Sequence, residues 1–101
     1  NTFANACGFG DSGDPLIDVN NGEAGLAGLP LKYITLGQVR QFRRHLPERI
    51  SVTGVGGVSD GEDVRDLEIA GATAVQVGTA FGINRNPRVF VDIATNYAQF
   101  W

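Results

Sequence analysis

Cysteine is almost absent from this sequence: Cys7 is the only one among its 101 residues. A single cysteine excludes a disulfide within the chain and suits a reducing compartment, so we expect a cytoplasmic location. Long apolar runs are also missing, because none approaches the roughly 20 residues that a membrane span needs. No signal peptide is recognisable either. We therefore expect no membrane segment in this chain.

Basic charge is scarce as well. Eight Lys and Arg residues against eleven Asp and Glu residues give a net charge of −3. A nucleic-acid partner would need a basic stripe, so we expect none. A P-loop is excluded because no glycine-rich run ends in Gly-Lys-Ser/Thr. The dinucleotide fingerprint also fails, because Ser59 occupies its third small position and no acidic residue closes the next strand.

Glycine, by contrast, is abundant, with 14 residues. The stretch 50–63, ISVTGVGGVSDGED, begins with the β-branched residues of a strand and continues through Gly56-Gly57. Ser59 and Glu62 then have the spacing of a capping box, which predicts a helix start. Such a strand, turn and helix start expose backbone amides and the positive end of a helix dipole. The stretch therefore predicts an anion-binding cradle.

A second turn of the same kind follows in the sequence. The predicted strand 73–77 ends in Gly78-Thr79, which is followed by another helix start. Two adjacent cradles can share one phosphate. This arrangement is typical of (β/α)8 barrels, in which the loops after strands 7 and 8 and a short extra helix hold a phosphate.

The first third of the chain carries weaker signals. Residues 4–23 are rich in Gly, Asp and Asn and are predicted to form a long loop. A compact turn of small residues, 25–30, follows this loop. Thr35 and Gln38 then predict a capping box for a helix that ends at Leu46, before a proline.

The charged residues of that helix have a structural explanation. Arg40, Arg43 and Arg44 fall largely opposite its apolar positions, so we interpret them as a solvated face. His45 lies in the last turn, where a cation suits the helix dipole, and we expect a structural role for it.

Two further helices complete the pattern. Gly71 occupies the position that ends the first, and Asn86-Pro87 begins the last, which is predicted to reach Trp101. The alternation of helices and strands predicts an α/β fold with a parallel sheet. A (β/α)8 barrel takes about 250 residues, so residues 1–101 would form only part of such a domain. We expect the remaining barrel half, or a second copy of the chain, to cover the sheet.

Five motifs together resemble the C-terminal part of dihydroorotate dehydrogenase, a flavoprotein with a (β/α)8 barrel. They are Asn1-Thr2, the Gly-Leu-Ala-Gly-x-Pro-Leu-Lys run 25–32, Gly-Val-Gly-Gly at 54–57, Gly-Glu-Asp at 61–63, and Ala-Gly-Ala-x-x-Val-Gln-Val-Gly-Thr-Ala at 70–80. Each motif is weak alone, but five in register are strong. The fold that the resemblance implies is the C-terminal portion of a TIM barrel.

The resemblance also implies roles for matching residues. The family's Asn-Ser/Thr pair hydrogen-bonds the pyrimidine substrate, and this pair matches Asn1 and Thr2. Gly25 matches the glycine that lies against FMN. The four remaining matches form the phosphate cradle for FMN: Gly56, Gly57, Gly78 and Thr79.

The implied activity is that of an oxidoreductase of pyrimidine biosynthesis, which oxidises dihydroorotate to orotate with FMN. No residue of this chain matches the family's catalytic base, because Cys7 lies outside that motif and reads as a plain free thiol. We therefore expect the isolated chain to be inactive. Fumarate, NAD and a quinone all stay open as the electron acceptor.

Other functions stay open at this point. A flavin-free phosphate-binding barrel fragment would use the same two cradles. A dihydropyrimidine dehydrogenase-like domain is a near neighbour of the family. A non-catalytic fragment that acts only by association through its sheet edge is favoured by the missing base. Asn1-Thr2 favours the dihydroorotate dehydrogenase over the flavin-free alternative.

Overall fold

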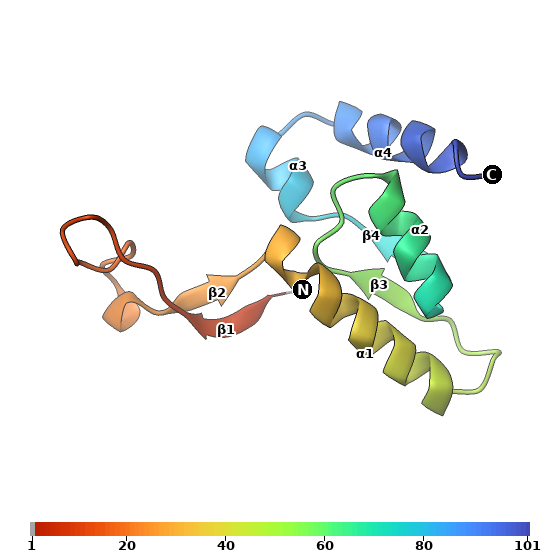
Figure 1. Cartoon of the computed structure of the whole chain (residues 1–101), viewed down its shortest axis with the longest axis horizontal. Coiled ribbons are helices and arrows are strands. Elements are labelled where there is room, and N and C mark those ends of the chain that lie inside the picture. The colour runs from red at the N-terminus through yellow and green to blue at the C-terminus, as the bar shows by residue number, and fades with distance from the viewer. Residues whose placement is uncertain (1) are drawn as a thin grey trace.

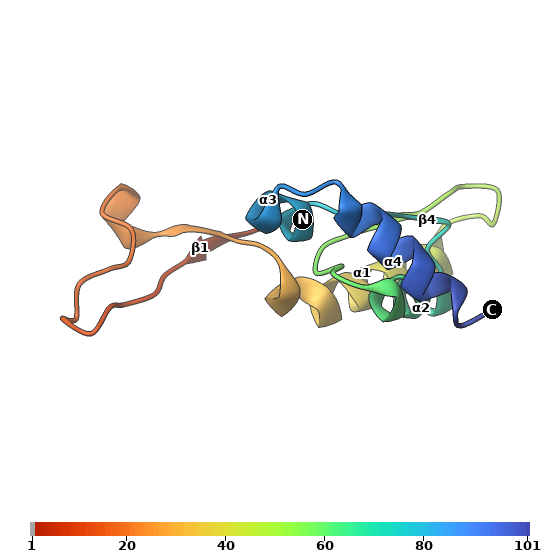
Figure 2. The same cartoon turned by 90° about the horizontal axis from the view of Figure 1, so that it is seen from above.

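The computed structural model describes residues 2–101, apart from the side chain of Asn84. The molecule is elongated, with extents of 48 × 33 × 17 Å. A β-hairpin projects from one end of a body made of helices and a small sheet (Figure 1). Figure 2 shows the same hairpin as an arm that extends away from the body. None of the described helices is both long enough and apolar enough to cross a membrane.

The hairpin consists of β1 (Phe3–Ala6) and β2 (Ala24–Leu26), which pair antiparallel with an irregular register between Phe3 and Ala6. A short 3-10 helix, η1 (Asn20–Gly22), precedes β2. The predicted loop 4–23 and turn 25–30 are therefore wrong at their ends, where strands form. The reason is that β1 has the sequence FANA, whose small residues carry no apolar alternation.

The body confirms the predicted order of helices and strands. Its elements are η2 (Leu29–Leu31), α1 (Lys32–His45), β3 (Thr53–Val55), α2 (Gly61–Ala70), β4 (Ala74–Gln76), α3 (Thr79–Asn84) and α4 (Arg88–Ala98). Strands β3 and β4 pair in parallel and are joined through α2. The fold is therefore mixed α/β, with a parallel pair of strands as predicted.

The core lies on one face of this sheet. Val39 of α1 and Leu67 of α2 pack there with Val52 and Val58. Gly54 permits the contact, because a Cβ at this position would lie 3.0 Å from a Leu67 methyl group. On the other face Thr53, Ala74 and Gln76 are exposed. Parallel strands are normally covered on both faces, so this sheet has an uncovered side.

Two predicted helix starts are wrong. Helix α1 begins at Lys32 directly after η2, and Thr35 is buried inside its first turn, so no Thr35–Gln38 capping box exists. Helix α2 is capped by Asp60, whose side chain accepts from the Asp63 amide, rather than by the predicted Ser59 and Glu62. Both Ser59 and Asp60 have an acidic residue three positions on, so the sequence pattern alone is ambiguous.

One predicted helix boundary is confirmed, since Gly71 ends α2 with a φ of +118°. The start of α4 lies one residue later than predicted, with Pro87 at the N-cap and Arg88 as the first helical residue. The Asn86 carboxamide oxygen still accepts from the Arg88 amide at 3.0 Å, as the side chain of a capping residue does. The last helix stops at Ala98, however, before the predicted end at Trp101.

The outer face of α1 largely follows the prediction. Arg40, Arg44 and His45 are exposed. Arg43 is half-buried, since its stem lies 2.5 Å from where a Cβ on Gly71 would stand, and its guanidinium donates to the Pro47 carbonyl. Arg43 therefore packs on the end of α2 rather than standing free in solvent.

Candidate functional site

A pocket of about 400 Å³ opens where β3 and β4 end. It is lined by Thr2 and by residues 27–29, 55–59, 76, 78–80, 83 and 89. The two predicted glycine turns thus meet at one concavity. Four proposed cradle residues, Gly56, Gly57, Gly78 and Thr79, all line it, and they are joined by Thr2 of the hairpin.

The turn after β3 requires glycine for conformation and for packing. Gly56 and Gly57 have φ values of +131° and +74°, which side chains rarely adopt. A Cβ on Gly57 would lie 2.5 Å from the Lys32 amide nitrogen and 2.7 Å from the Lys32 Cα. The space beside Gly57 is therefore filled by the start of α1. This contact is a structural reason for glycine that the sequence did not indicate.

The turn after β4 is built differently. A Cβ on Gly78 would meet no atom within 4 Å, so the space beside this residue is open. Gly28, with a φ of +86°, lies against the Thr79 side chain and brings the end of the hairpin segment to the second turn. In the described part of the chain, the amides of Gly57, Gly78 and Thr79 donate to no protein group. They remain able to donate to an anion.

Of the three residues predicted to contact the substrate or the flavin ring, one lines the pocket. Thr2 lines the pocket, whereas Asn1 lies outside the described residues. Gly25 does not line the pocket but lies in β2 against Thr2, whose methyl group would overlap a Cβ at position 25. Gly25 is thus next to a pocket residue, and its contact with a flavin stays a prediction.

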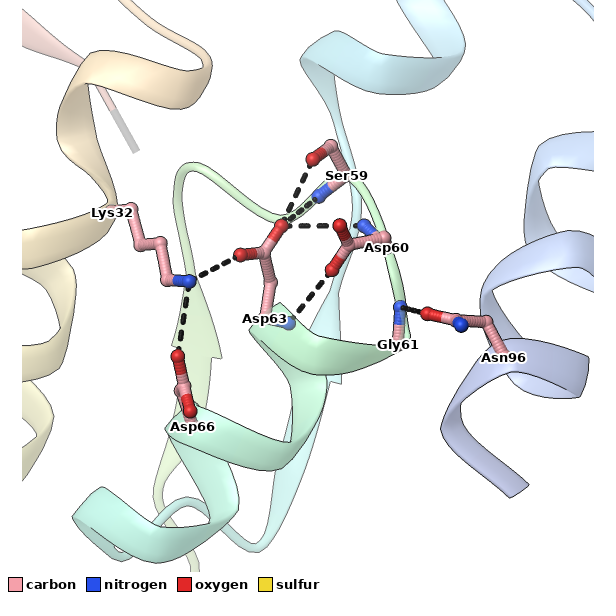
Figure 3. A network of polar contacts seen from close by, with 7 residues as sticks. All are labelled: Lys32, Ser59, Asp60, Gly61, Asp63, Asp66 and Asn96. Carbon is pink, nitrogen blue, oxygen red and sulfur yellow. Dashed lines mark hydrogen bonds and ion pairs between the residues drawn. The ribbon is translucent and has the colours of Figure 1, made fainter. Parts of the chain in front are cut away.

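A polar network beside the first glycine turn, Gly56-Gly57, was not predicted (Figure 3). Its centre is Asp63, which is 5% exposed. One carboxylate oxygen accepts from the Ser59 amide at 2.8 Å, the Ser59 hydroxyl at 2.9 Å and the Asp60 amide at 3.2 Å. The other oxygen lies 2.7 Å from the ammonium of Lys32, which also contacts Asp66 at 3.0 Å. One buried carboxylate therefore joins the turn, α1 and α2.

The electrostatics of the network keep both partners charged. Burial alone would raise the pKa of Asp63, but hydrogen bonds from Lys32 and from the Ser59 amide and hydroxyl outweigh it and lower this pKa. The hydrogen bonds to Asp63 and Asp66 raise the pKa of Lys32 far above its ordinary value. The pair is therefore ionised at neutral pH.

The network continues to the last helix. The Asn96 carboxamide oxygen of α4 accepts from the Gly61 amide at 2.7 Å (Figure 3). Gly61 must lack a side chain, since a Cβ there would overlap the backbone of Asn96 and Tyr97. Helix α4 therefore holds the start of α2 from the side opposite Lys32.

Sequence reasoning missed Lys32, Asp63 and Asn96. Lys32 and Asp63 stand inside motifs that carry the family resemblance, which was the one available signal. No local pattern marks Asn96, because its partner Gly61 is 35 residues away. Cys7 and His45 do not line the pocket, so neither thiol nor imidazole is placed for proton transfer there.

Comparison with known proteins adds to this geometry. The sequence model of one family, described as dihydroorotate dehydrogenase, matches residues 2–100. A dihydroorotate dehydrogenase (quinone), mitochondrial, from Schizosaccharomyces pombe is 50% identical over 58 residues, 57% of this chain and 13% of the relative. A dihydroorotate dehydrogenase B (NAD(+)), catalytic subunit, from Methanopyrus kandleri is 46% identical over 59 residues, 58% of this chain and 19% of the relative.

A third relative covers more of the chain. Dihydroorotate dehydrogenase A (fumarate) from Lactococcus lactis is 33% identical over 75 residues, 74% of this chain and 24% of the relative. The chain thus spans about a quarter or less of the length of these three relatives. The family match nevertheless includes both glycine turns and the Asp63 network. This chain belongs to the dihydroorotate dehydrogenase family.

Proposed function

We propose that this chain is the C-terminal portion of a (β/α)8 TIM barrel that oxidises dihydroorotate to orotate with FMN, a step of pyrimidine biosynthesis. Residues 1–101 would form part of one barrel domain and carry the FMN phosphate cradle with part of the substrate site. Family membership supports the reaction. The observation that supports the role of this chain is the single pocket shared by the two glycine turns and Thr2.

The residues present fit a phosphate group. Three pocket residues, Gly57, Gly78 and Thr79, have amides that find no acceptor among the described residues, and Gly78 faces open space. Backbone amides that converge from two turns make a concave donor site, which is suited to an anion. A volume of about 400 Å³ also lies within the range of ligand pockets.

Each part of the chain has a distinct task in this proposal. FMN, when bound, supplies the hydride-accepting chemistry. The glycine turns bind its phosphate, and Gly25, which packs against Thr2, lies against the flavin as the family resemblance implies. Asn1 and Thr2 orient the pyrimidine, because a carboxamide both donates and accepts along the alternating C=O and N–H edge. The chain supplies binding and orientation, while the base that removes a substrate proton comes from elsewhere in the barrel.

The uncovered sheet face supports a proposal about the partner of this chain. In the described residues β3 and β4 form a two-stranded sheet, and no third strand lies beside them. Its bare face favours further elements, which we propose come from the remaining barrel half or from a second copy. A cytoplasmic location is part of the proposal. The relatives are named for three different electron acceptors, so we propose none.

The test uses a complete-barrel protein, in which this chain replaces the matching segment of the Lactococcus lactis relative. This protein should bind FMN and form orotate, measured by ultraviolet absorbance. Asn1→Ala should lower turnover about 100-fold with flavin still bound, because substrate hydrogen bonds are lost. Residues 1–101 alone, with added FMN, should form no orotate, since general acid–base help contributes roughly 10²–10⁴ in rate. Orotate from the lone chain, or full turnover in Asn1→Ala, would refute the assignment.

A second experiment tests the cradle by filling it. Gly78→Val places a side chain in the open space beside the pocket without an internal clash. Gly82→Val is the matched control, because its Cβ also meets no atom within 4 Å but Gly82 does not line the pocket. We expect only Gly78→Val to lose the visible flavin absorbance. Equal retention of FMN by both variants would show that the phosphate is held elsewhere.

A further inference from the structure

Lys32 is linked to the first glycine turn, Gly56-Gly57, directly through its backbone and indirectly through its side chain, which binds Asp63. Its backbone fills the space beside Gly57, where a Cβ would lie 2.5 Å from the Lys32 nitrogen. Its ammonium lies 2.7 Å from the Asp63 carboxylate, below the same turn. The start of α1 is thus fixed both to the glycines that line the pocket and to the helix that follows them.

Asp63 holds the opposite end of the turn. Its second carboxylate oxygen accepts from both donors of Ser59 and from the Asp60 amide. Ser59 itself lines the pocket. The segment between Gly57 and Asp60 therefore has its entry packed on Lys32 and its exit bonded to Asp63, and the two anchors are joined by an ion pair.

From this geometry we propose that Lys32 and Asp63 are positioning residues for the anion cradle, which set the affinity of the pocket for the phosphate part of its ligand. This inference rests on the proposed function. Neither side chain lines the pocket, so both act through the backbone of the turn. Pre-organised amides bind an anion more tightly because no ordering of the turn is needed at binding.

The charge on Asp63 is essential to this role. A carboxylate offers acceptor oxygens on both sides, one toward Ser59 and one toward Lys32. An asparagine has one oxygen and one NH2 group. If its oxygen accepts from Ser59, its NH2 group faces the Lys32 ammonium, and the reverse orientation leaves the Ser59 donors facing a donor. Asp63→Asn is thus nearly isosteric but cannot satisfy both sides of the network.

The test compares FMN with riboflavin, which has the same ring but no phosphate, in the complete-barrel protein. Asp63→Asn should weaken FMN binding about 10-fold and riboflavin binding less than about 2-fold, as expected for mispaired donors around the phosphate site. Lys32→Met should behave similarly, and Lys32→Arg should restore most of the FMN affinity because a guanidinium can also bridge two carboxylates. Glu62→Gln is the matched control, since Glu62 is exposed in the same helical turn and should change neither affinity.

Hydrogen exchange at Ser59 and Asp60 gives a readout that does not depend on flavin. Both amides donate to Asp63, so Asp63→Asn should speed their exchange at least about 10-fold while Glu62→Gln does not. Equal losses for FMN and riboflavin would mean a merely structural role and would overturn the inference. A parent protein that binds no FMN overturns the proposed function, and unchanged exchange in Asp63→Asn separately overturns the positioning role.

Discussion

The hairpin and the body of this molecule are ordered in different ways. Between residues 2 and 26 only Gly22 is buried, and Phe9 and Leu16 are 66% and 72% exposed. Backbone hydrogen bonds such as that from Leu16 to Gly8 maintain the hairpin. The body instead depends on side chains from distant segments, of which Asp63 at 5% exposure is the clearest case. The hairpin is thus held by hydrogen bonds between residues near in sequence, whereas the body is held by contacts between distant segments.

The proposed phosphate site and the proposed substrate site lie in these two differently held regions. The amides proposed for the phosphate belong to the body, where Lys32 and Asp63 hold the turn. Thr2, which is proposed for the substrate, belongs to the exposed hairpin. Elements with few buried contacts open and move more easily than packed ones. We therefore expect changes in the body to be costly and comparable changes in the hairpin to be mild.

The largest expected contrast is between two glycines with similar backbone conformation. Gly57 and Gly13 have φ values of +74° and +85°, but a Cβ on Gly57 meets Lys32 while a Cβ on Gly13 meets nothing within 4 Å. Gly57→Val should abolish FMN retention and disrupt the contact of α1 with the turn. Gly13→Val should carry only the backbone strain, about 1–2 kcal/mol. Flavin absorbance and thermal unfolding of the complete-barrel protein measure both, and similar losses would refute the contrast.

Removal of a carboxylate should give the next largest contrast. Asp63→Ala leaves buried donors and the Lys32 ammonium without their acceptor, and should cost about 3–5 kcal/mol in the free energy of unfolding. The Asp14 side chain accepts one exposed hydrogen bond, from the Ser12 hydroxyl, so Asp14→Ala should cost less than about 0.5 kcal/mol. Urea unfolding followed by circular dichroism measures both values. A loss of less than about 1 kcal/mol in the free energy of unfolding for Asp63→Ala would show that the Asp63 network does not stabilise the body.

Acid should destabilise the body through Asp63. Because the folded-state pKa of Asp63 is lowered, its contribution is fully present above the unfolded value of about 3.9 and is lost as the pH falls through the folded value. Asp63→Asn should therefore show a flatter decline of stability below about pH 4. Lys32 has a raised pKa, so its contribution is lost only as the pH rises above about 10.4. Parallel acid profiles for parent and Asp63→Asn would exclude this origin.

The smallest effect is expected at Cys7. Its thiol is exposed in the hairpin, so an alkylating reagent should modify it in the folded protein. The melting temperature of the body should change by less than about 1 °C, because no buried contact is lost. Mass spectrometry confirms the modification and circular dichroism gives the melting temperature. A large shift would show that the hairpin and body are coupled after all.

The parts of the fold that follow from local chemistry were predictable. Gly71 and Asn86 mark helix ends through backbone conformation and a side-chain cap, which the sequence displays directly. The Gly56-Gly57 turn is equally local. The start of α2 was misplaced by one residue because Ser59 and Asp60 compete as caps, and the bond that the Asp63 amide donates to the Asp60 carboxylate decides between them.

The parts that depend on distant pairing were not predictable. β1 becomes a strand only because Phe3 and Leu26 align across the hairpin. The Lys32–Asp63 pair likewise joins two helices, and no local sequence pattern shows that these two residues meet. The glycine turns thus predicted a site for an anion, but not what holds those turns in place.

Lys32 and Asn96, which contact α2 from opposite sides, are made at different times during synthesis. Lys32 and Asp63 both precede α4 in the chain, so a growing polypeptide can join α1 to the first turn before the last helix exists. Asn96 is made later, and its bond to Gly61 closes only when α4 docks. Because chains fold from the N-terminal side as they are made, we expect the Lys32–Asp63 ion pair to form before the bond between Gly61 and Asn96. In a growing chain that still lacks Asn96, the Lys32–Asp63 ion pair can therefore hold the first glycine turn while the Gly61 amide still lacks its acceptor on α4.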